Sequence, residues 1–322
     1  RLDKMFKEDR AEFEKKWDDI KIFIEYGMLS DEKFCDSARK YALLKDSEGK
    51  YFTFEEYKTL VESTQTDKDG NIIYLYATDC EAQYSYIQSA KSKGYSVLTM
   101  DGQLDSHFVS LLEHKLENTH LVRVDADIID RLIVKDDALK VDLTAEQIEI
   151  ASDLFKSQLP TIEKTEFFVQ LEALSQQDTP AIVTQSEHMR RFKEMSAMNP
   201  GMNFYGEMPD NYSLTINCDN ASVKKIITEA CSAIEEKIAP LRNEINQLNS
   251  SIEEARKADE KADTSENEAK VAELRKQQGD IIAQYATTIP TIKQIIDLSL
   301  LQSGLLKAQS LDDFIRRSYS LL

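Results

Sequence analysis

The residues nearest in type to a catalytic or metal-binding group are three of the four histidines and two aspartates: His107, His114, His120, Asp101 and Asp105. Histidine and carboxylate side chains can bind a metal ion or transfer a proton where they converge. His107 and His114 are seven residues apart, so on a helix they share a face but lie two turns apart, too far for one ion. We therefore predict no catalytic residue and no metal site, and we interpret this segment as scaffold.

Phosphate chemistry is not predicted for this chain either. Strands and helices alternate between residues 71 and 134, and such a unit can bind a nucleotide at its strand ends. However, no glycine-rich loop follows any of these strands, and the chain contains no Gly-Lys-Ser/Thr sequence. We therefore expect no ATPase activity, no nucleotide binding and no cofactor in this chain.

The composition favours a folded protein that binds neither nucleic acid nor membranes. Charged residues make up 30% of the chain and hydrophobic residues 41%, values typical of globular proteins. The net charge of -18 opposes contact with nucleic acid and with anionic lipids, and no apolar run is long enough to span a bilayer. We expect a cytoplasmic protein, because its widely separated cysteines are typical of thiols in a reducing compartment: Cys35, Cys80, Cys218 and Cys231.

A methionine-rich segment at 186–198 offers a binding surface rather than a reactive group. Met189, Phe192, Met195 and Met198 recur every three residues in a predicted helix. Methionine is flexible and polarizable, and it is over-used on surfaces that bind many partners. The pattern alone slightly favours an apolar stripe in the core. The turn-forming and large apolar residues that follow favour a protein-binding ridge.

The last segment, 291–322, is predicted to form two helices that associate with a second copy of the chain. Its first half is apolar over most of its circumference, which is typical of burial in a core or against another chain. Because chain ends usually lie at the surface, we predict a homodimer held by a four-helix bundle; the alternative is a helix pair docked on its own domain. The predicted interface residues are Ile295, Leu298, Leu301, Leu305, Phe314, Ile315 and Leu321.

The elements that position these surfaces are predicted to form a mixed α+β fold in three parts. Residues 1–64 are predicted to be a helical linker. Residues 65–138 alternate strands and helices, which predicts a small three-layer α/β/α unit with a parallel sheet. Residues 139–322 are predicted to be a mixed α/β dimerisation domain that ends in the 291–322 dimer helices. It includes an inserted helical hairpin at 239–285, with Ile and Leu at coiled-coil spacing.

Local signals predict where several helices begin and end. Gly27 is placed to end the long first helix and Ser30 to cap the next. Thr53 and Thr144 each begin a capping box. Ser310 is predicted to cap the last helix, where Asp312 and Asp313 would favour its first turn.

The order of these parts resembles the middle and C-terminal domains of the heat shock protein 90 family, in its bacterial form. Four segments carry the resemblance, which covers nearly the whole chain: 13–27 (FEKKWDDIKIFIEYG), 72–77, 181–198, and 298–322 ending FIRRSYSLL. The resemblance implies an ATP-driven dimeric chaperone that remodels client proteins. It implies client-binding positions at Met189, Phe192, Met195 and Met198, and we add Trp17 as a candidate, although its pattern favours a core residue.

The resemblance also implies that the nucleotide-binding domain lies upstream of residue 1, so that ATP and magnesium act only in the full-length protein. We expect this fragment to bind unfolded or partly folded clients, to dimerise and to hydrolyse no ATP; the heat shock protein 70 system is a further implied partner. The alternative function is a dimeric scaffold or adaptor that binds one specific folded protein through the same ridge.

Overall fold

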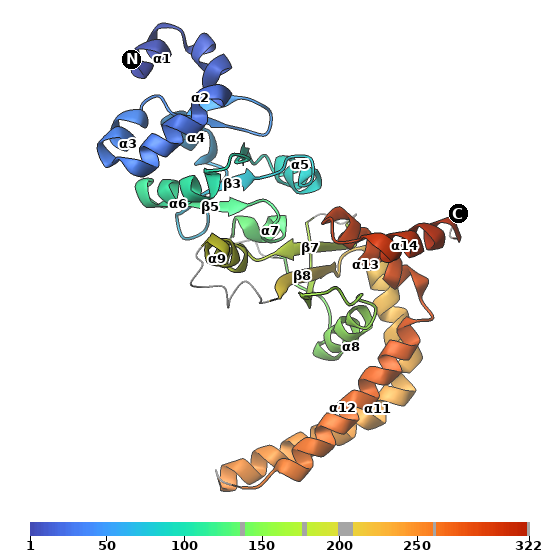
Figure 1. The fold of residues 1–322 in the computed structure, drawn as a ribbon. Helices are drawn as coiled ribbons and strands as arrows, with labels where there is room; N and C mark the ends of the chain where they lie inside the picture. Colours follow the sequence, from blue (N-terminus) through green and yellow to red (C-terminus); the bar gives the residue numbers. More distant parts are fainter. Residues whose placement is uncertain (136–138, 176–178, 199–208, 260–261, 321–322) are drawn as a thin grey trace. The chain divides into compact units, whose positions relative to one another are not determined.

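The computed structural model describes five stretches of the chain: residues 1–135, 139–175, 179–198, 209–259 and 262–320. The side chains at 194, 195, 197 and 198 lie outside that description. The fold is mixed α+β, as predicted, and the chain divides into two compact units (Figure 1). Unit 1 comprises residues 1–138 and 184–206, and unit 2 comprises residues 139–183 and 207–322.

Unit 1 begins with three helices: α1 (Leu2–Glu8), α2 (Arg10–Ser30) and α3 (Glu32–Ala38). The predicted helix end at Gly27 and cap at Ser30 are wrong, because α2 continues to Ser30 and Asp31 caps α3 by accepting from the Phe34 amide at 3.0 Å. Gly27 serves packing instead: a Cβ there would lie 2.7 Å from Phe34 Cε1. The glycine therefore lets α3 approach α2 closely.

A short antiparallel hairpin follows, in the region 1–64 that is predicted to be helical. It pairs β1 (Leu43–Lys45) with β2 (Tyr51–Thr53) and leads into α4 (Phe54–Val61). Three-residue strands carry too little periodicity to be recognised. The predicted capping box of α4 is confirmed: Thr53 Oγ1 accepts from the Glu56 amide at 3.3 Å, and the Thr53 amide donates to the Glu56 carboxylate at 2.8 Å.

The predicted parallel sheet is present in unit 1. Its strand order is β4 (Val97–Thr99), β3 (Ile72–Ala77), β5 (Thr119–Arg123), and both pairings are parallel. All of β3 is buried, as expected for a central strand covered on both faces. The other helices in the described part of unit 1 are α5 (Tyr84–Ser92), α6 (Asp105–Lys115), α7 (Ile129–Leu132) and α9 (Glu187–Met198).

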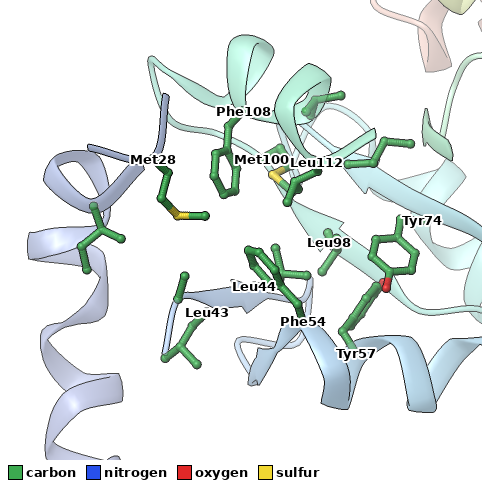
Figure 2. Close-up of a cluster of buried hydrophobic side chains, with 14 of the residues drawn as sticks. Met28, Leu43, Leu44, Phe54, Tyr57, Tyr74, Leu98, Met100, Phe108 and Leu112 are labelled. Carbon is green, nitrogen blue, oxygen red and sulfur yellow. The ribbon is translucent and has the colours of Figure 1, made fainter. Parts of the chain in front are cut away.

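One hydrophobic core joins the first helices to the parallel sheet. Figure 2 shows Met28 of α2, Leu44 of β1 and Phe108 of α6 gathered around a common centre. Trp17 belongs to the same core and is 1% exposed, so its interpretation as a core residue is confirmed. Residues 1–64 and 65–138 therefore share a core.

Unit 2 combines α8 (Ala145–Lys156) with a sheet of strand order β6 (Thr165–Glu172), β8 (Asp210–Asn217), β7 (Ala181–Gln185). The strands β6 and β8 pair in parallel along their whole length. The predicted capping box of α8 is confirmed, since Thr144 Oγ1 accepts from the Gln147 amide at 3.2 Å. The core of the unit lies between α8, this sheet and the helices that follow.

The helical hairpin is formed by α11 (Ala221–Ala258) and α12 (Ser265–Ala286), which run side by side (Figure 1). α11 starts well before residue 239: Asn220 caps it by accepting from the Val223 amide at 3.3 Å, and the helix continues through Pro240. Its first half lies in the unit core, so the hairpin extends from a core helix. Beyond the core, the two arms share an apolar cluster: Ile245, Ile252, Val271 and Leu274.

Two helices end the described chain: α13 (Pro290–Gln302) and α14 (Ala308–Ser320). The chain turns between them at Gly304, whose φ of 73° is favoured by glycine alone. The predicted cap at Ser310 is wrong, because α14 already begins at Ala308 and Ser310 lies inside its first turn. The helix pair itself matches the prediction.

Candidate functional site

The methionine-rich helix α9 is fixed to unit 1 through its first turn. Glu187 accepts hydrogen bonds from Tyr76 Oη at 2.8 Å, Arg190 Nη2 at 2.6 Å and Arg191 Nε at 2.5 Å. Arg191 also donates to Glu113 of α6 at 2.8 Å and to a backbone carbonyl of β5 at 2.7 Å. These contacts join α9 to a strand and a helix of the parallel-sheet region.

The electrostatics of this attachment favour the ionised pairs. Burial alone would raise the pKa of Glu187, but the charges of Arg190 and Arg191 outweigh it and hold that pKa below its usual value. Burial raises the pKa of Tyr76 to about 12, so the phenol stays protonated and can donate. Because the carboxylate accepts from these three side chains and from the Arg123 amide at 3.2 Å, the first turn of α9 has one well-defined position on unit 1.

Of the two described apolar side chains of α9, Met189 lies on the face opposite this attachment and Phe192 lies to one side of it. Successive residues of an α-helix are about 100° apart, which places Met189 about 160° from both Glu187 and Arg191, and Phe192 about 140° from Glu187 and about 100° from Arg191. Both side chains are half-buried. Met195 and Met198 lie on the same helix, but their side chains are outside the described residues.

Trp17, the remaining client-binding candidate, offers no comparable surface. Its indole packs against Phe13 with ring centroids 5.9 Å apart, inside the core of unit 1. Because the side chain is 1% exposed, a client could reach it only if α2 moved. The candidate surface therefore reduces to α9.

The predicted dimer residues divide between an inner and an outer face of the terminal helices. Ile295 and Phe314 point into the core of unit 2 and are 4% and 8% exposed. The outer face exposes Leu298, Leu301 and Ile315, at 45%, 42% and 40%. Leu305 is half-buried, and Leu321 lies outside the described residues.

Two further residues of these helices stand out in the structure. Tyr319 is 72% exposed on α14, and Asp297 is only 1% exposed on α13. Burial of the Asp297 charge is explained by two cations, Lys293 at 2.8 Å and Arg317 at 2.6 Å. The sequence shows Lys293 at helical spacing from Asp297, but it cannot show the pairing with Arg317 on another helix.

A third polar cluster lies between α2 and α6 in unit 1. Lys21 donates to Asp105 at 2.9 Å and lies 3.7 Å from the Glu25 carboxylate, and both carboxyl groups are buried. A cavity of about 270 Å³ adjoins it, lined in part by Lys21, Glu25 and Asp101. Burial raises the pKa of Glu25 to about 8, although the charge of Lys21 opposes the shift. One cation facing two buried carboxyl groups favours a bound proton at neutral pH.

Within the described parts of the chain, no three histidine, cysteine, aspartate or glutamate side chains converge to form a possible metal site. None of the described helices is long and apolar enough to cross a membrane. The candidate sites described above are apolar surfaces on helices that buried ion pairs position.

Curated relatives match this chain along its whole length. The chaperone protein HtpG of Bacteroides fragilis is 46% identical over 333 residues, and those of Bacteroides thetaiotaomicron and Porphyromonas gingivalis are 45% identical over 333 residues. Each match covers 100% of this chain but 49% of the relative, so the chain spans about half the length of these relatives. No protein-family profile matches the chain.

Identity at this level over every part of the chain establishes its family. The chain belongs to the heat shock protein 90 family, in its bacterial HtpG form. The family that the sequence resembles is thereby confirmed.

Proposed function

We propose that this chain is a client-binding and dimerising segment of a bacterial heat shock protein 90 chaperone. Its relatives are named as chaperones, and it aligns with about half of each. The observation that carries the proposal is the architecture of α9, where a buried polar attachment fixes the first turn and Met189 and Phe192 lie half-buried away from it. A rigid helix with an adaptable apolar face suits partners of varied sequence.

The proposed clients are unfolded or partly folded proteins, which expose apolar segments. Met189 and Phe192 would bind such segments together with Met195 and Met198. Half-buried side chains still gain from contact, because about 25 cal/mol is released for each Å² of apolar surface removed from water. Because each residue contributes only a modest binding free energy, the client can be released again, as a chaperone requires.

The proposed dimer uses the outer face of α13 and α14. Leu298, Leu301 and Ile315 are exposed there although large apolar residues are usually buried. A second copy of the chain would cover them in a four-helix bundle. The chain would act in the cytoplasm and cooperate with the heat shock protein 70 system, as the resemblance implies.

ATP hydrolysis is proposed to belong to the whole protein and not to this segment. The segment carries no phosphate-binding loop sequence. Titration calorimetry of the chain with ATP and magnesium should therefore give no saturable heat. Binding of ATP in the micromolar range would contradict the proposal that ATP hydrolysis belongs to the whole protein and not to this segment.

The alternative, an adaptor for one folded partner, predicts a different binding profile. We propose to titrate the chain with several unrelated proteins, each in native and in reduced, unfolded form, and to follow fluorescence anisotropy. The chaperone function predicts comparable affinity for most unfolded forms and little for the native ones. Failure to bind any unfolded protein would reject it, and tight binding to a single native protein would support the adaptor.

A further inference from the structure

A network of polar side chains joins α13 to α14. Arg317 donates from Nη2 to Asp297 Oδ2 at 2.6 Å and from Nε to Gln294 Oε1 at 2.9 Å. Lys293 donates to Asp297 Oδ1 at 2.8 Å, and Gln294 Nε2 donates to Ser318 Oγ at 2.9 Å. These five residues are called the α13–α14 bridge below.

The bridge is built around a buried charge. The Asp297 side chain is 1% exposed, while its partners Lys293 and Arg317 remain 30% and 19% exposed. A carboxylate withdrawn from water is stable only when both oxygens are paired, as they are here. The position of Asp297 in α13 therefore dictates where Arg317, and with it α14, must lie.

Apolar packing alone holds α14 weakly. All residues of this helix are described, and Phe314 is its one buried side chain. Leu311 is only partly buried against the core of unit 2. The guanidinium of Arg317 also lies 5.8 Å from the centre of the Phe314 ring, so the bridge and the single apolar anchor support each other.

We propose that Asp297 and Arg317 are positioning residues for dimerisation, because their bridge holds the exposed side chains of the two helices at the angle a second copy requires. Leu298 and Leu301 follow Asp297 on α13, and Ile315 and Tyr319 flank Arg317 on α14. Helices in bundles pack at a narrow range of crossing angles, so two pairs fit only if each pair has a fixed geometry. The inference rests on the dimer proposed above and adds residues that need not touch the second copy.

The test compares two neighbouring arginines of the same helix. Arg317→Met removes the guanidinium and keeps an apolar stem, whereas Arg316→Met changes a side chain that is 77% exposed and pairs with Asp312 on its own helix. Sedimentation equilibrium gives the dimer dissociation constant of each variant. We expect an increase of about tenfold or more for Arg317→Met and less than about twofold for Arg316→Met.

A second variant separates positioning from folding. Arg317→Met alone leaves Asp297 buried with one cation fewer, which can unfold the helix pair. The double variant Asp297→Leu, Arg317→Met removes both charges, and such replacements are often neutral for folding. We expect the double variant to keep the wild-type urea midpoint and helical circular dichroism but to dimerise about tenfold or more weakly. Arg317→Lys, which keeps the charge but not both donors, should fall between.

The results of these measurements separate the positioning role of Asp297 and Arg317 from dimerisation of the chain. A dimeric wild type with an equally tight double variant would overturn the positioning role and leave the dimer standing. If Arg317→Met dimerises more weakly but the double variant does not, the loss of affinity is due to the uncompensated buried charge of Asp297. That result would also overturn the positioning role. A monomeric wild-type chain would reject the dimer, and the positioning role with it.

Discussion

Glu25 shares a buried site with Asp105 and the cation of Lys21. Burial raises its pKa from 4.5 to about 8. Between these two values the folded chain holds a proton that the unfolded chain has released, so this group makes the free energy of unfolding fall as pH rises. The stabilisation is fully present below the unfolded pKa and is lost as pH rises through the folded one.

The change Glu25→Gln removes this titration and isolates its effect. Relative to wild type, the variant should gain on the order of 2 to 4 kcal/mol of unfolding free energy between pH 5 and pH 9. Trp17, the sole tryptophan, lies in the same unit, so its fluorescence in urea reports the relevant transition. The exposed Glu81→Gln serves as control and should show no such trend. A Glu25→Gln difference that stays constant with pH would contradict the protonated pair.

Two glycines test whether close packing or helix propensity decides the effect of an added methyl group. Both lie inside helices, but a Cβ at Gly27 would meet Phe34 at 2.7 Å, whereas none of the described atoms lies within 4 Å of a Cβ at Gly279. Gly27→Ala should therefore destabilise unit 1 by about 1 to 3 kcal/mol. Gly279→Ala should stabilise the α11–α12 hairpin by up to about 1 kcal/mol.

Urea unfolding followed by Trp17 fluorescence measures the first change, and the helical circular dichroism signal measures the second. Stabilisation by Gly27→Ala would mean that the Phe34 ring moves aside easily. Destabilisation by Gly279→Ala would reveal contacts on the outer face of the hairpin.

At the scale of elements, α9 is where binding and stability can be separated. Changing Met189 and Phe192 together to alanine removes two half-buried side chains from the face opposite Glu187. If this face is the client surface, the pair should weaken binding of an unfolded client by about ten- to a hundredfold. The free energy of unfolding should change by about 1 kcal/mol or less, since the side chains are not core residues.

Urea melts and client anisotropy measured on the same samples decide between the two interpretations of α9. His188→Ala, an exposed change on the same helix, is the control and should alter neither. A large shift of the melt with unchanged affinity per folded molecule would place Met189 and Phe192 in the core and reject the site.

The second proposed surface, the dimer interface, includes the exposed face of α13. Leu301 is 42% exposed and Leu300 beside it is buried, so adjacent positions distinguish interface from core. Leu301→Glu should leave the unfolding transition of the isolated subunit nearly unchanged and should abolish dimers in light scattering, because a charge would be buried between two copies. An equally dimeric Leu301→Glu protein would exclude this face as the interface.

Much of this fold could be predicted because long elements repeat their signals. The strand 72–77, the capping boxes at Thr53 and Thr144 and the terminal helix pair each rest on several residues that agree. Single-residue signals failed where tertiary packing decided the outcome. Gly27 accommodates Phe34 rather than ending a helix, and Ser310 lies inside a helix that begins earlier.

The candidate sites were predicted less completely than the fold. Apolar periodicity pointed to the outer faces of α9 and α13, but it could not separate Leu301 from the buried Ile295 on one nearly all-apolar helix. The polar contacts that fix these helices join residues far apart in the sequence. Two examples are the contact of Tyr76 with Glu187 and the contact of Asp297 with Arg317. In neither case does the sequence contain a spacing from which the contact could be predicted.

At the scale of the whole molecule, the two proposed surfaces belong to different units. The helix α9 is part of unit 1, although the chain on either side of residues 184–206 belongs to unit 2, and α13 and α14 are part of unit 2. A protein that uses both surfaces would present two client-binding helices per dimer. Two sites on one particle increase the effective concentration of each for a long unfolded chain.

The net charge of -18 bears on the same assembly. Like charges repel across a dimer interface, and at physiological ionic strength salt largely screens the repulsion between exposed charges more than about 8 Å apart. The dimer dissociation constant should therefore fall when salt is raised from low to physiological concentration. An opposite salt dependence in sedimentation equilibrium would indicate an interface held by ion pairs instead of apolar contact.

The most direct test of the central claim is sedimentation velocity of this chain mixed with a fluorescent, permanently unfolded client, detected through the client's label. We expect the label to sediment with a particle that contains two copies of the chain. With Met189→Ala, Phe192→Ala, the dimer should persist while the label sediments as free client. A label that sediments alone with wild type, or with a single copy of the chain, would contradict a dimeric client-binding chaperone segment.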